Sequence, residues 1–294
     1  MDIYLSSPSE KALDLVQERC PEMKIDLLLT SARMPSDIDA YMERHKNILR
    51  KKALDSGAFS DNNSNLNIST RNLFHRHINH AKVHKCDFDI VFNFDIDFTP
   101  DGFYTNQAYL HEMENYGVHP VPVIHNMKSH EIDTFIHEGY DYVAIGKQQN
   151  KTKPEVLFPA VFKLHSYGVR THLFGITEFD LIAGCPATSC DSKSWLDDAR
   201  TGVVRFWNPA KPGINKTDVI YFPEKLGRTK SGTHLYTRYE HLDEFERFIG
   251  NYGLTKDDLR GLKETLNREF LGILYYSKLA DVVTKLHAAN QLFF

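Results

Sequence analysis

Extended apolar stretches are missing from this sequence, and their absence sets the first limit on what the protein can be. Hydrophobic residues make up 41% of its 294 residues. No apolar run, however, approaches the roughly 18 residues that a membrane-crossing helix requires. The first residues, MDIYLSSPSE, lack the basic start and apolar stretch of a secretion signal. We therefore expect a globular cytoplasmic protein without a membrane partner.

Cysteine is also scarce. Four cysteines in a chain of this length are too few for a disulfide framework, which indicates free thiols in a reducing compartment. Cys185 and Cys190 are separated by four residues, with His172 upstream, and this spacing is looser than structural zinc sites use. We expect no structural zinc, no other metal and no cofactor.

An excess of positive charge is absent as well, since 35 basic and 39 acidic residues give a net charge of −4. This balance excludes a simple nucleic-acid-binding module that is basic over its whole surface. Any contact with nucleic acid must come from local clusters, and a solvated helix face is the alternative for each. One cluster lies within residues 44–52; the other contains Arg71, Arg76, Lys82 and Lys85.

What the sequence does contain is a regular alternation of short apolar runs with amphipathic stretches. The alternation repeats eight times before residue 195, which favours a parallel sheet closed into a (β/α)8 barrel over an open sheet. We predict this TIM-like α/β barrel as the catalytic domain over residues 1–200. Its strands are expected near residues 3–5, 25–30, 53–55, 90–95, 120–125, 142–146, 171–175 and 189–191.

After Asp191 the alternation stops. The segment 202–223 is rich in turn residues and is expected to be irregular or β structure, and helical patterns follow at 237–249, 255–269 and 271–290. We predict that residues 201–294 form an extension that packs on the barrel.

The carboxyl ends of the strands are where the loops of such a barrel converge and where its chemistry collects. Three strands end in an aspartate directly after apolar residues, where an unpaired carboxylate is costly. Capping of the following helix is the alternative for any one of them. The strand-end residues are Asp55, Asp95, Asp97, His125, Gly146, Lys147, Gly175 and Asp191.

Small residues at these ends indicate a flat ligand. Ser56, Gly57 and Ala58 leave little side chain behind Asp55, and Phe59 offers a ring for stacking. Two carboxylates across a pocket are the usual equipment for breaking a bond to an anomeric carbon, and in a retaining arrangement they stand about 5 Å apart. A third carboxylate is then free to read the N1–H and amine of a guanine.

Five segments, LDSGAFS, NFDID, AIGK, HLFGIT and CDSKSW, occur in the order found in a known family. Over roughly residues 50 to 210 the chain resembles phage-type 7-deazaguanine DNA transglycosylases, relatives of the queuine tRNA-ribosyltransferases. The DSGAF and DS-x-SW elements carry most of the specificity. Ala58 and Ser60 depart from the tRNA enzymes, and their compact CxCxxC zinc motif is absent, which favours the phage-type branch.

The resemblance implies a role for each matching position. Asp191 would attack C1′ of the sugar and hold the nucleic acid as a glycosyl ester, and Asp55 would act as general acid and base. Asp95 would read the Watson–Crick edge of the base. The remaining pocket residues would be Ser56, Gly57, Phe59, His125, Gly146, Lys147, Phe174 and Gly175.

The resemblance also implies the partners. They would be DNA, free guanine and a free 7-deazaguanine base, in the host cytoplasm if a phage encodes the protein. Duplex DNA would have to flip out its target nucleotide, and the basic segment 71–85 would contact phosphates. A homodimer is compatible with the sequence.

Four alternatives stay open on the residues alone. The same chemistry can act on tRNA, or water can resolve the intermediate, as in a glycosidase. A catalytically silent barrel can bind a base or nucleic acid. A metal-dependent hydrolase would instead use the aspartates and His125 as ligands.

Overall fold

The computed structural model describes residues 1–58, 69–99, 102–146, 152–224, 230–261 and 264–292. The chain divides into two compact units. The first comprises residues 1–7, 25–192 and 283–294, and the second comprises residues 8–24 and 193–282. This division differs from the predicted boundary at residue 200, because residues 8–24 and 193–200 group with the later part of the chain.

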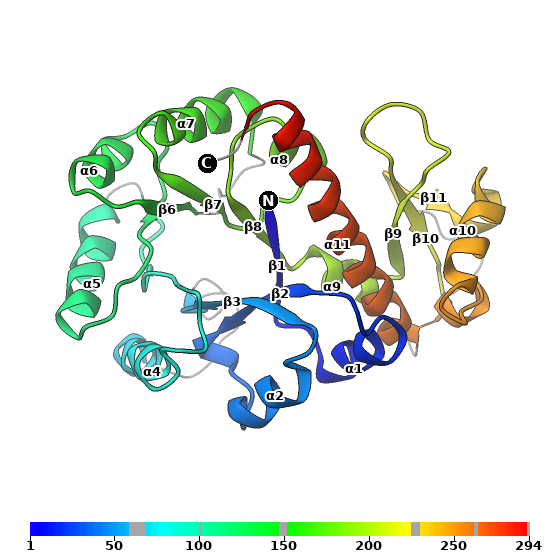
Figure 1. Ribbon diagram of the computed structural model, residues 1–294, viewed down its shortest axis with the longest axis horizontal. Helices are drawn as coiled ribbons and strands as arrows, with labels where there is room; N and C mark the ends of the chain where they lie inside the picture. The colour runs from blue at the N-terminus through cyan, green and yellow to red at the C-terminus, as the bar shows by residue number, and fades with distance from the viewer. Residues whose placement is uncertain (59–68, 100–101, 147–151, 225–229, 262–263, 293–294) are drawn as a thin grey trace. The chain divides into compact units, whose positions relative to one another are not determined.

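The first unit is built on a parallel sheet of eight strands that closes on itself (Figure 1). The strand order is β4-β3-β2-β1-β8-β7-β6-β5, and a parallel bridge between Phe92 and Val121 joins the two outer strands. The predicted (β/α)8 barrel is therefore confirmed. Its strands are β1 (Asp2–Ser6), β2 (Ile25–Thr30), β3 (Leu49–Asp55), β4 (Ile90–Val91), β5 (Val123–Ile124), β6 (Tyr142–Ile145), β7 (Arg170–Leu173) and β8 (Ser189–Ser192).

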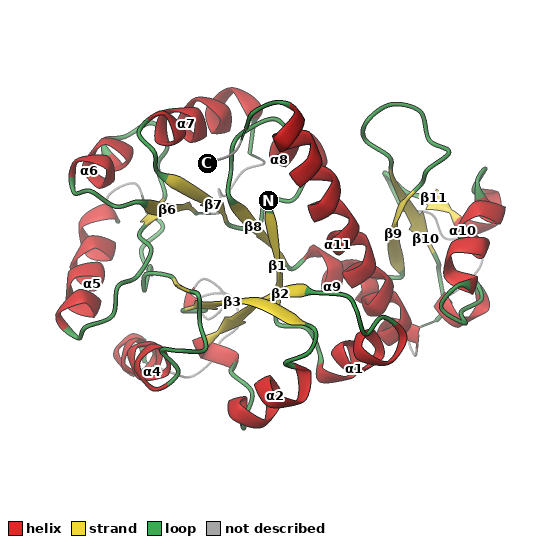
Figure 2. Ribbon diagram, in the orientation of Figure 1, coloured by secondary structure: helices red, strands yellow, loops and turns green. Residues whose placement is uncertain are grey.

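Helices of this unit lie outside the ring of strands (Figure 2). Polar residues fix where they begin: Asp37 accepts a hydrogen bond from the amide of Ala40, and Ser69 accepts one from the amide of Asn72. The elements are η1 (Ser31–Arg33), α2 (Ile38–His45), α4 (Thr70–Val83), α5 (Phe103–Asn115), α6 (Glu131–His137), α7 (Pro154–Ser166) and α8 (Phe179–Ala183).

The interior of the barrel is apolar on one side and polar on the other. Five of the first six strands, and Phe92 directly after β4, each contribute one buried residue to a single cluster, whereas β7 and β8 contribute the fully buried His172 and Ser189. Side chains of a strand alternate in direction, so residues two positions further along each strand face the same side. Those residues lie nearer the carboxyl end of the barrel. The cluster consists of Tyr4, Leu28, Ala53, Phe92, Val123 and Ala144.

The second unit contains a small sheet and several helices. Strands β9 (Val203–Trp207) and β10 (Thr217–Tyr221) are antiparallel, and β11 (His234–Leu235) pairs parallel with β10. The expected β character of residues 202–223 is thus confirmed. The helix expected at 271–290 corresponds to α11, which also includes residues 265–269, whereas residues 257–259 of the helix expected at 255–269 form only the short η3. The helical elements are α1 (Glu10–Arg19), α9 (Ser194–Arg200), η2 (Tyr236–Arg238), α10 (Leu242–Gly250), η3 (Asp257–Leu259) and α11 (Thr265–Ala289), of which residues 283–289 belong to the first unit.

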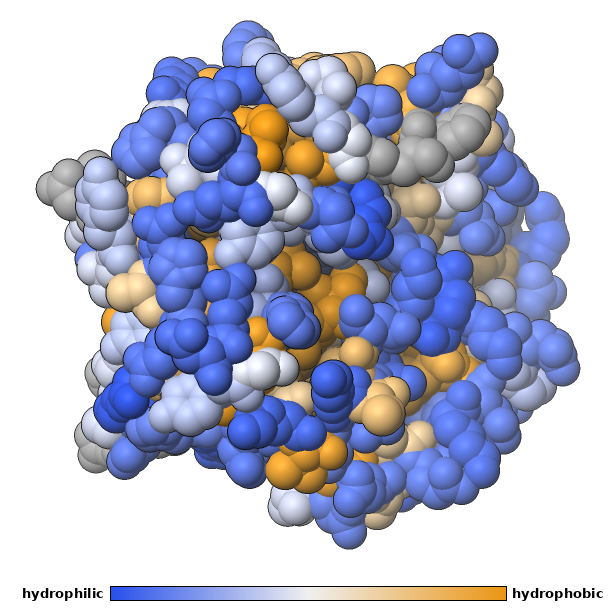
Figure 3. All heavy atoms as spheres, turned by 60° about the vertical axis from the view of Figure 1, so that its left-hand side comes forward, coloured by the Kyte–Doolittle hydropathy of each residue, from blue (hydrophilic) through white to orange (hydrophobic). Residues whose placement is uncertain are grey.

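Hydrophilic residues cover most of the face shown in Figure 3, and hydrophobic residues are visible mainly between them. Among the helices that the structure describes, none combines the length and apolar character needed to cross a bilayer.

Candidate active site

Three carboxylates from distant parts of the chain meet at the carboxyl end of the barrel. Asp55 is the last residue of β3, Asp191 lies in β8, and Asp95 follows β4. The charges of Asp95 and Asp191 both raise the pKa of Asp55, which places the three side chains in one electrostatic environment. The three residues thus lie at the carboxyl ends of their strands and interact electrostatically.

Asp55 is the carboxyl group that holds a proton near neutral pH. Burial, followed by the charge of Asp95, raises the pKa of Asp55 to about 7. The amides of Gly57 and Ser56 oppose the shift, and the amide of Gly57 donates to Asp55 Oδ2 over 3.1 Å. Gly57 has a φ of +79°, and a Cβ there would lie 2.7 Å from the Cβ of Ala32. Only glycine fits this turn, which wraps the backbone around the carboxylate.

Asp191 is held by two donors. Its Oδ1 accepts the amide of Gly175 over 2.7 Å, and its Oδ2 accepts the hydroxyl of Ser6 over 2.8 Å. Both donors fix the orientation of the carboxylate. Asp191 is buried, with 7% of its surface exposed. A carboxylate that is oriented in this way at the barrel mouth is equipped to act as a nucleophile.

Asp95 pairs with His125 at the end of β5, with 3.1 Å between His125 Nε2 and Asp95 Oδ2. Burial disfavours the charged ring, but Asp95, together with Glu131 and Asp97, outweighs it and raises the pKa of His125. Glu131 also accepts the backbone amide of His125 over 2.7 Å. Gly146 makes room for the ring, since a Cβ at residue 146 would lie 2.7 Å from His125 Nδ1.

The loop that carries Asp95 is fixed by Asn106 from α5. Asn106 Oδ1 accepts the amides of Ile96 and Asp97, and its Nδ2 donates to the carbonyl of Asp97 over 2.8 Å. The carboxylate of Asp97 accepts both the amide and the hydroxyl of Thr99, so this residue caps the loop. These bonds, chiefly those from Thr99, lower the pKa of Asp97.

Two contacts of the nucleophile candidate involve residues that the sequence analysis did not assign to the site. Ser6 ends β1, so the strand-end rule applied to the other strands would have found it. His172 was considered only as a zinc ligand, yet its Nε2 lies 3.7 Å from Asp191 Oδ1. The sequence does contain a signal for His172, because this residue stands two positions before Phe174 and therefore on the same face of the strand.

The remaining predicted pocket residues are Ser56, Phe174, Phe59 and Lys147. Ser56 is buried in the Asp55 turn, and its hydroxyl accepts the amide of Ala58. Phe174 packs its ring 4.6 Å from that of Phe92 and 4.7 Å from that of His172, measured between centroids. The predicted residues Phe59 and Lys147 lie outside the described part of the chain.

The predicted nucleic-acid-binding residues are spread along α4 and the turn after it. Arg71, in the first turn of the helix, forms a two-pronged ion pair with Glu112 over 2.7 and 2.9 Å. Arg76 is half-buried. Lys82 lies over the ring of Tyr116, and it and the exposed Lys85 are at the opposite end of the helix. That end leads into β4 and is therefore remote from the carboxylates.

The other basic cluster, in residues 44–52, is engaged with carboxylates. Arg50 Nε donates to Asp26 over 2.8 Å, and Lys51 forms an ion pair with Asp2 over 2.8 Å. Arg50, Lys51 and Lys52 belong to strand β3 and not to a helix face. These ion pairs lie near the amino ends of the strands.

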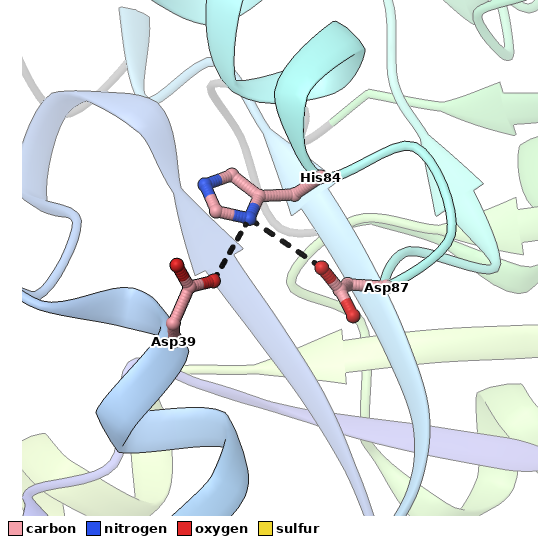
Figure 4. A group of neighbouring side chains, drawn as sticks. All are labelled: Asp39, His84 and Asp87. Atoms are coloured by element: carbon pink, nitrogen blue, oxygen red, sulfur yellow. Dashed lines mark ion pairs between the residues drawn. The ribbon is translucent and has the colours of Figure 1, made fainter.

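One group of side chains has the composition of a metal site (Figure 4). His84 Nδ1 lies 3.4 Å from a carboxylate oxygen of Asp39 and 3.4 Å from one of Asp87. The two carboxylates are 82% and 46% exposed, and ion pairing with His84 accounts for the arrangement. Among the described residues, Cys185, Cys190 and His172 do not form such a group.

A cavity of about 550 Å³ opens at the other end of the barrel. It is lined by residues at or near the amino ends of the strands, among them Asp2, Lys51, Asp89, Tyr142 and Arg170. In barrels of this type that end contributes to stability, whereas chemistry occurs at the carboxyl ends. The cavity is therefore separate from the three carboxylates.

No family model matches the chain, and no curated protein matches it. The chain is similar to a solved structure described as a putative fructose-1,6-biphosphate aldolase from Coccidioides immitis. The TM-score is 0.52 at 10% identity, over 97% of this chain and 91% of that chain. A second structure, of a probable tagatose 6 phosphate kinase from Sinorhizobium meliloti 1021, gives a TM-score of 0.42 at 11% identity, over 98% and 86% of the two chains. At these identities the first similarity supports the barrel fold and nothing about substrate.

Proposed function

We propose that this protein is a base-exchange glycosyltransferase that removes guanine from DNA and inserts a 7-deazaguanine through a covalent Asp191 intermediate. One observation carries the proposal. Asp55 and Asp191 meet at the carboxyl end of the barrel in contrasting environments: Asp55 has a pKa of about 7, whereas Asp191 accepts two hydrogen bonds. Such a contrast is how one site supplies both a proton shuttle and a nucleophile.

In the first half-reaction an oxygen of Asp191 attacks C1′, and the bond from C1′ to N9 of guanine breaks with its electron pair moving to the base. Protonated Asp55 gives its proton to the departing guanine, which leaves neutral. In the second half, the Asp55 carboxylate takes the N9 proton of the incoming base. N9 then attacks C1′, the ester bond breaks, and Asp191 regains its negative charge. The same pocket holds both bases in turn, so the kinetics are ping-pong.

Base selection falls to Asp95 in this proposal. Its carboxylate has acceptor oxygens that suit the N1–H and exocyclic amine of guanine, and a 7-deazaguanine presents the same edge. His125 holds Asp95 in place through their ion pair, and Glu131 holds the backbone of His125. The ring of Phe174, at the inner wall of the barrel, offers an apolar surface beside the site.

DNA is favoured over tRNA by the motif resemblance, and the start of α4 is where phosphate contacts are expected. Arg71 is 51% exposed at its side chain and stands in the first turn after the Asp55 loop. Its partner Glu112 would be exchanged for phosphate on binding. A duplex substrate must also release its target base, at a cost of roughly a few kcal/mol.

The decisive experiment is nucleoside mass spectrometry of DNA and tRNA from cells that express the protein and receive a 7-deazaguanine. The modified nucleoside is expected in DNA. Modification of tRNA alone would assign the alternative polymer, and unchanged nucleosides in both would overturn the proposal. Activity abolished by a chelator would favour the metal-dependent hydrolase.

Trapping the intermediate supplies a second test. Purified protein incubated with guanine-containing DNA should give a denaturation-resistant adduct, which Asp191→Ala abolishes. Asp141→Asn is the matched control, because Asp141 is 82% exposed at its side chain and lies near the amino ends of the strands. An adduct that water resolves to abasic DNA without any added base would identify a glycosidase instead.

A further inference from the structure

Behind Asp191, three buried polar side chains from neighbouring strands are joined in a line. The hydroxyl oxygens of Tyr142 on β6 and Ser189 on β8 are 2.6 Å apart, and Ser189 Oγ lies 2.6 Å from His172 Nδ1 on β7. His172 Nε2 then faces Asp191 Oδ1 at 3.7 Å. Ser189 and His172 are fully buried, and Tyr142 is 7% exposed. This line of groups is not needed to explain the barrel fold.

The hydrogens in this line can be arranged in two ways. In the first, Tyr142 donates to Ser189, Ser189 donates to His172 Nδ1, and the ring carries its hydrogen on Nε2, facing the carboxylate. In the second, every donor is reversed, and a lone pair on Nε2 faces the negative charge. The carboxylate attracts an N–H and repels a lone pair, so it selects the first arrangement.

The ring is neutral in this arrangement. Burial lowers the pKa of His172, although Asp191 opposes the shift. A neutral imidazole has one donor nitrogen and one acceptor nitrogen, so the bond with Ser189 decides which nitrogen faces Asp191. Nε2 makes no hydrogen bond in the described structure and is fully buried, and Asp191 is the polar group that it faces.

We infer that His172 is a positioning residue for Asp191, with its tautomer set by Ser189 and Tyr142. The inference rests on the proposed function. An N–H aimed at Oδ1 attracts the carboxylate and holds it beside the Gly175 amide, oriented for attack on C1′. It also stabilises the negative charge that returns to Asp191 when the ester bond breaks in the second half-reaction.

Other titratable groups face this line. Burial raises the pKa values of Tyr4 and Cys190, so both are neutral over the working range of pH. Asp55 and Asp191 also interact electrostatically, and the pKa of Asp55 is about 7. Under the proposed function, adduct formation therefore falls at high pH as Asp55 loses its proton.

A second buried serine–histidine pair in the same barrel provides a matched control. Ser31 Oγ lies 2.8 Å from His77 Nδ1, and His77 Nε2 lies 2.9 Å from the carbonyl of Phe92. The carbonyl accepts only, so it fixes the hydrogen of His77 on Nε2. His77 is fully buried like His172, but its Nε2 faces a backbone carbonyl and no carboxylate.

The first test is long-range nitrogen–proton NMR at neutral pH on the full chain, with His172 assigned by its loss in His172→Gln. The expected result is a neutral ring with its hydrogen on Nε2, as in His77. A hydrogen on Nδ1, or a doubly protonated ring, would overturn the inference. This measurement needs no substrate, so its outcome is independent of the proposed function.

The second test measures the rate of adduct formation at neutral pH. His172→Leu should slow it by roughly tenfold, because the carboxylate loses the polar N–H that faces it. His172→Gln, which retains an amide donor, should restore much of the rate. Ser189→Ala should slow adduct formation as well, and Ser31→Ala should not.

The outcomes separate the two proposals. A wild-type protein that forms no adduct counts against the proposed function. A normal wild-type adduct that forms at the same rate in His172→Leu and Ser189→Ala counts against the role of His172 alone. Loss of folded protein, checked by circular dichroism, would lower the amplitude of adduct formation without changing its rate constant.

Discussion

The hydroxyl of Ser6 lies 2.8 Å from Asp191 Oδ2, although the two residues are 185 positions apart in the chain. The contact exists because β1 and β8 are neighbours in the closed sheet, with Tyr4 paired to Asp191 and Leu5 to Ser192. Ser6 therefore reaches across from the next strand to the carboxylate. Closure of the barrel is what completes the immediate surroundings of Asp191.

Replacing this hydroxyl should weaken the nucleophile without unfolding the barrel. Ser6→Ala removes one of two donors to Asp191, so adduct formation should slow by about tenfold, as expected for one hydrogen bond to a charged group. Ser192→Ala is the control, because Ser192 is also buried but points to the other face of β8 than Asp191. Equal rates in the two variants would remove Ser6 from the site.

Asp55 should make the protein less stable as pH rises. Its pKa is about 7 in the folded protein, compared with about 3.9 in an unfolded chain. The folded form therefore retains a proton that the unfolded form releases, and the free energy of unfolding falls between about pH 4 and pH 7. Asp55→Asn removes this dependence. The variant should gain stability over wild type with rising pH, by an amount of the order of a few kcal/mol at pH 8.

Urea titrations at several pH values test this, with the exposed Asp141→Asn variant as the control for a changed net charge. A stability difference between Asp55→Asn and wild type that stays constant with pH would show that Asp55 has an ordinary pKa. The general acid would then have to be a different group.

We expect glycine to be required at position 146 because a larger residue would collide with His125, and not because the backbone conformation there needs glycine. In Gly146→Ala the new Cβ would stand 2.7 Å from His125 Nδ1, so the ring must move and its ion pair with Asp95 is strained. We expect weaker binding of the free base, seen as a raised KM, with a loss of unfolding free energy of about 1–3 kcal/mol. Gly250→Ala, where nothing lies within 4 Å of the new Cβ, should leave KM unchanged.

Along α4, only the start of the helix should contribute to nucleic-acid binding. Arg71→Ala should weaken DNA binding. It should also reduce the slope of log affinity against log salt concentration by about the amount that one phosphate contact contributes. Lys82→Ala should change neither, because Lys82 is at the far end of the helix. Fluorescence anisotropy over a salt series measures both variants, and equal effects would place the DNA along the whole helix.

The sequence was sufficient to predict the architecture, because the alternation of apolar runs is a local signal. The strand predicted at residues 25–30 matches β2 residue for residue, and Asp55 does end its strand as expected. Local patterns do not fix the first residue of a helix as well: Asp37 caps α2, although neighbouring side chains of the same kind can also accept an amide hydrogen bond.

The candidate site was predictable in its carboxylates but not in their contacts. The strand-end rule identifies Asp55, Asp95 and Asp191 without knowing the register between strands. Which donors reach Asp191 depends on that register, and therefore on the pairing of β1 with β8. The line from Tyr142 to His172 depends on three strands at once, and no sequence window contains it.

Neighbouring strands of the barrel are joined by ladders of unequal length. Six residue pairs join β2 to β3 and four join β1 to β8, whereas the seam between β4 and β5 has a single bridge at Phe92 and Val121. Two strands that are joined by few residue pairs separate at a lower free-energy cost than two strands that are joined by many. Asp55 and Asp191 are carried by β3 and β8, whose ladders with β2 and β1 are among the longer ones, while Asp95 and His125 flank the seam with the single bridge. If the proposed function holds, the side of the barrel that reads the base is therefore the side expected to open first.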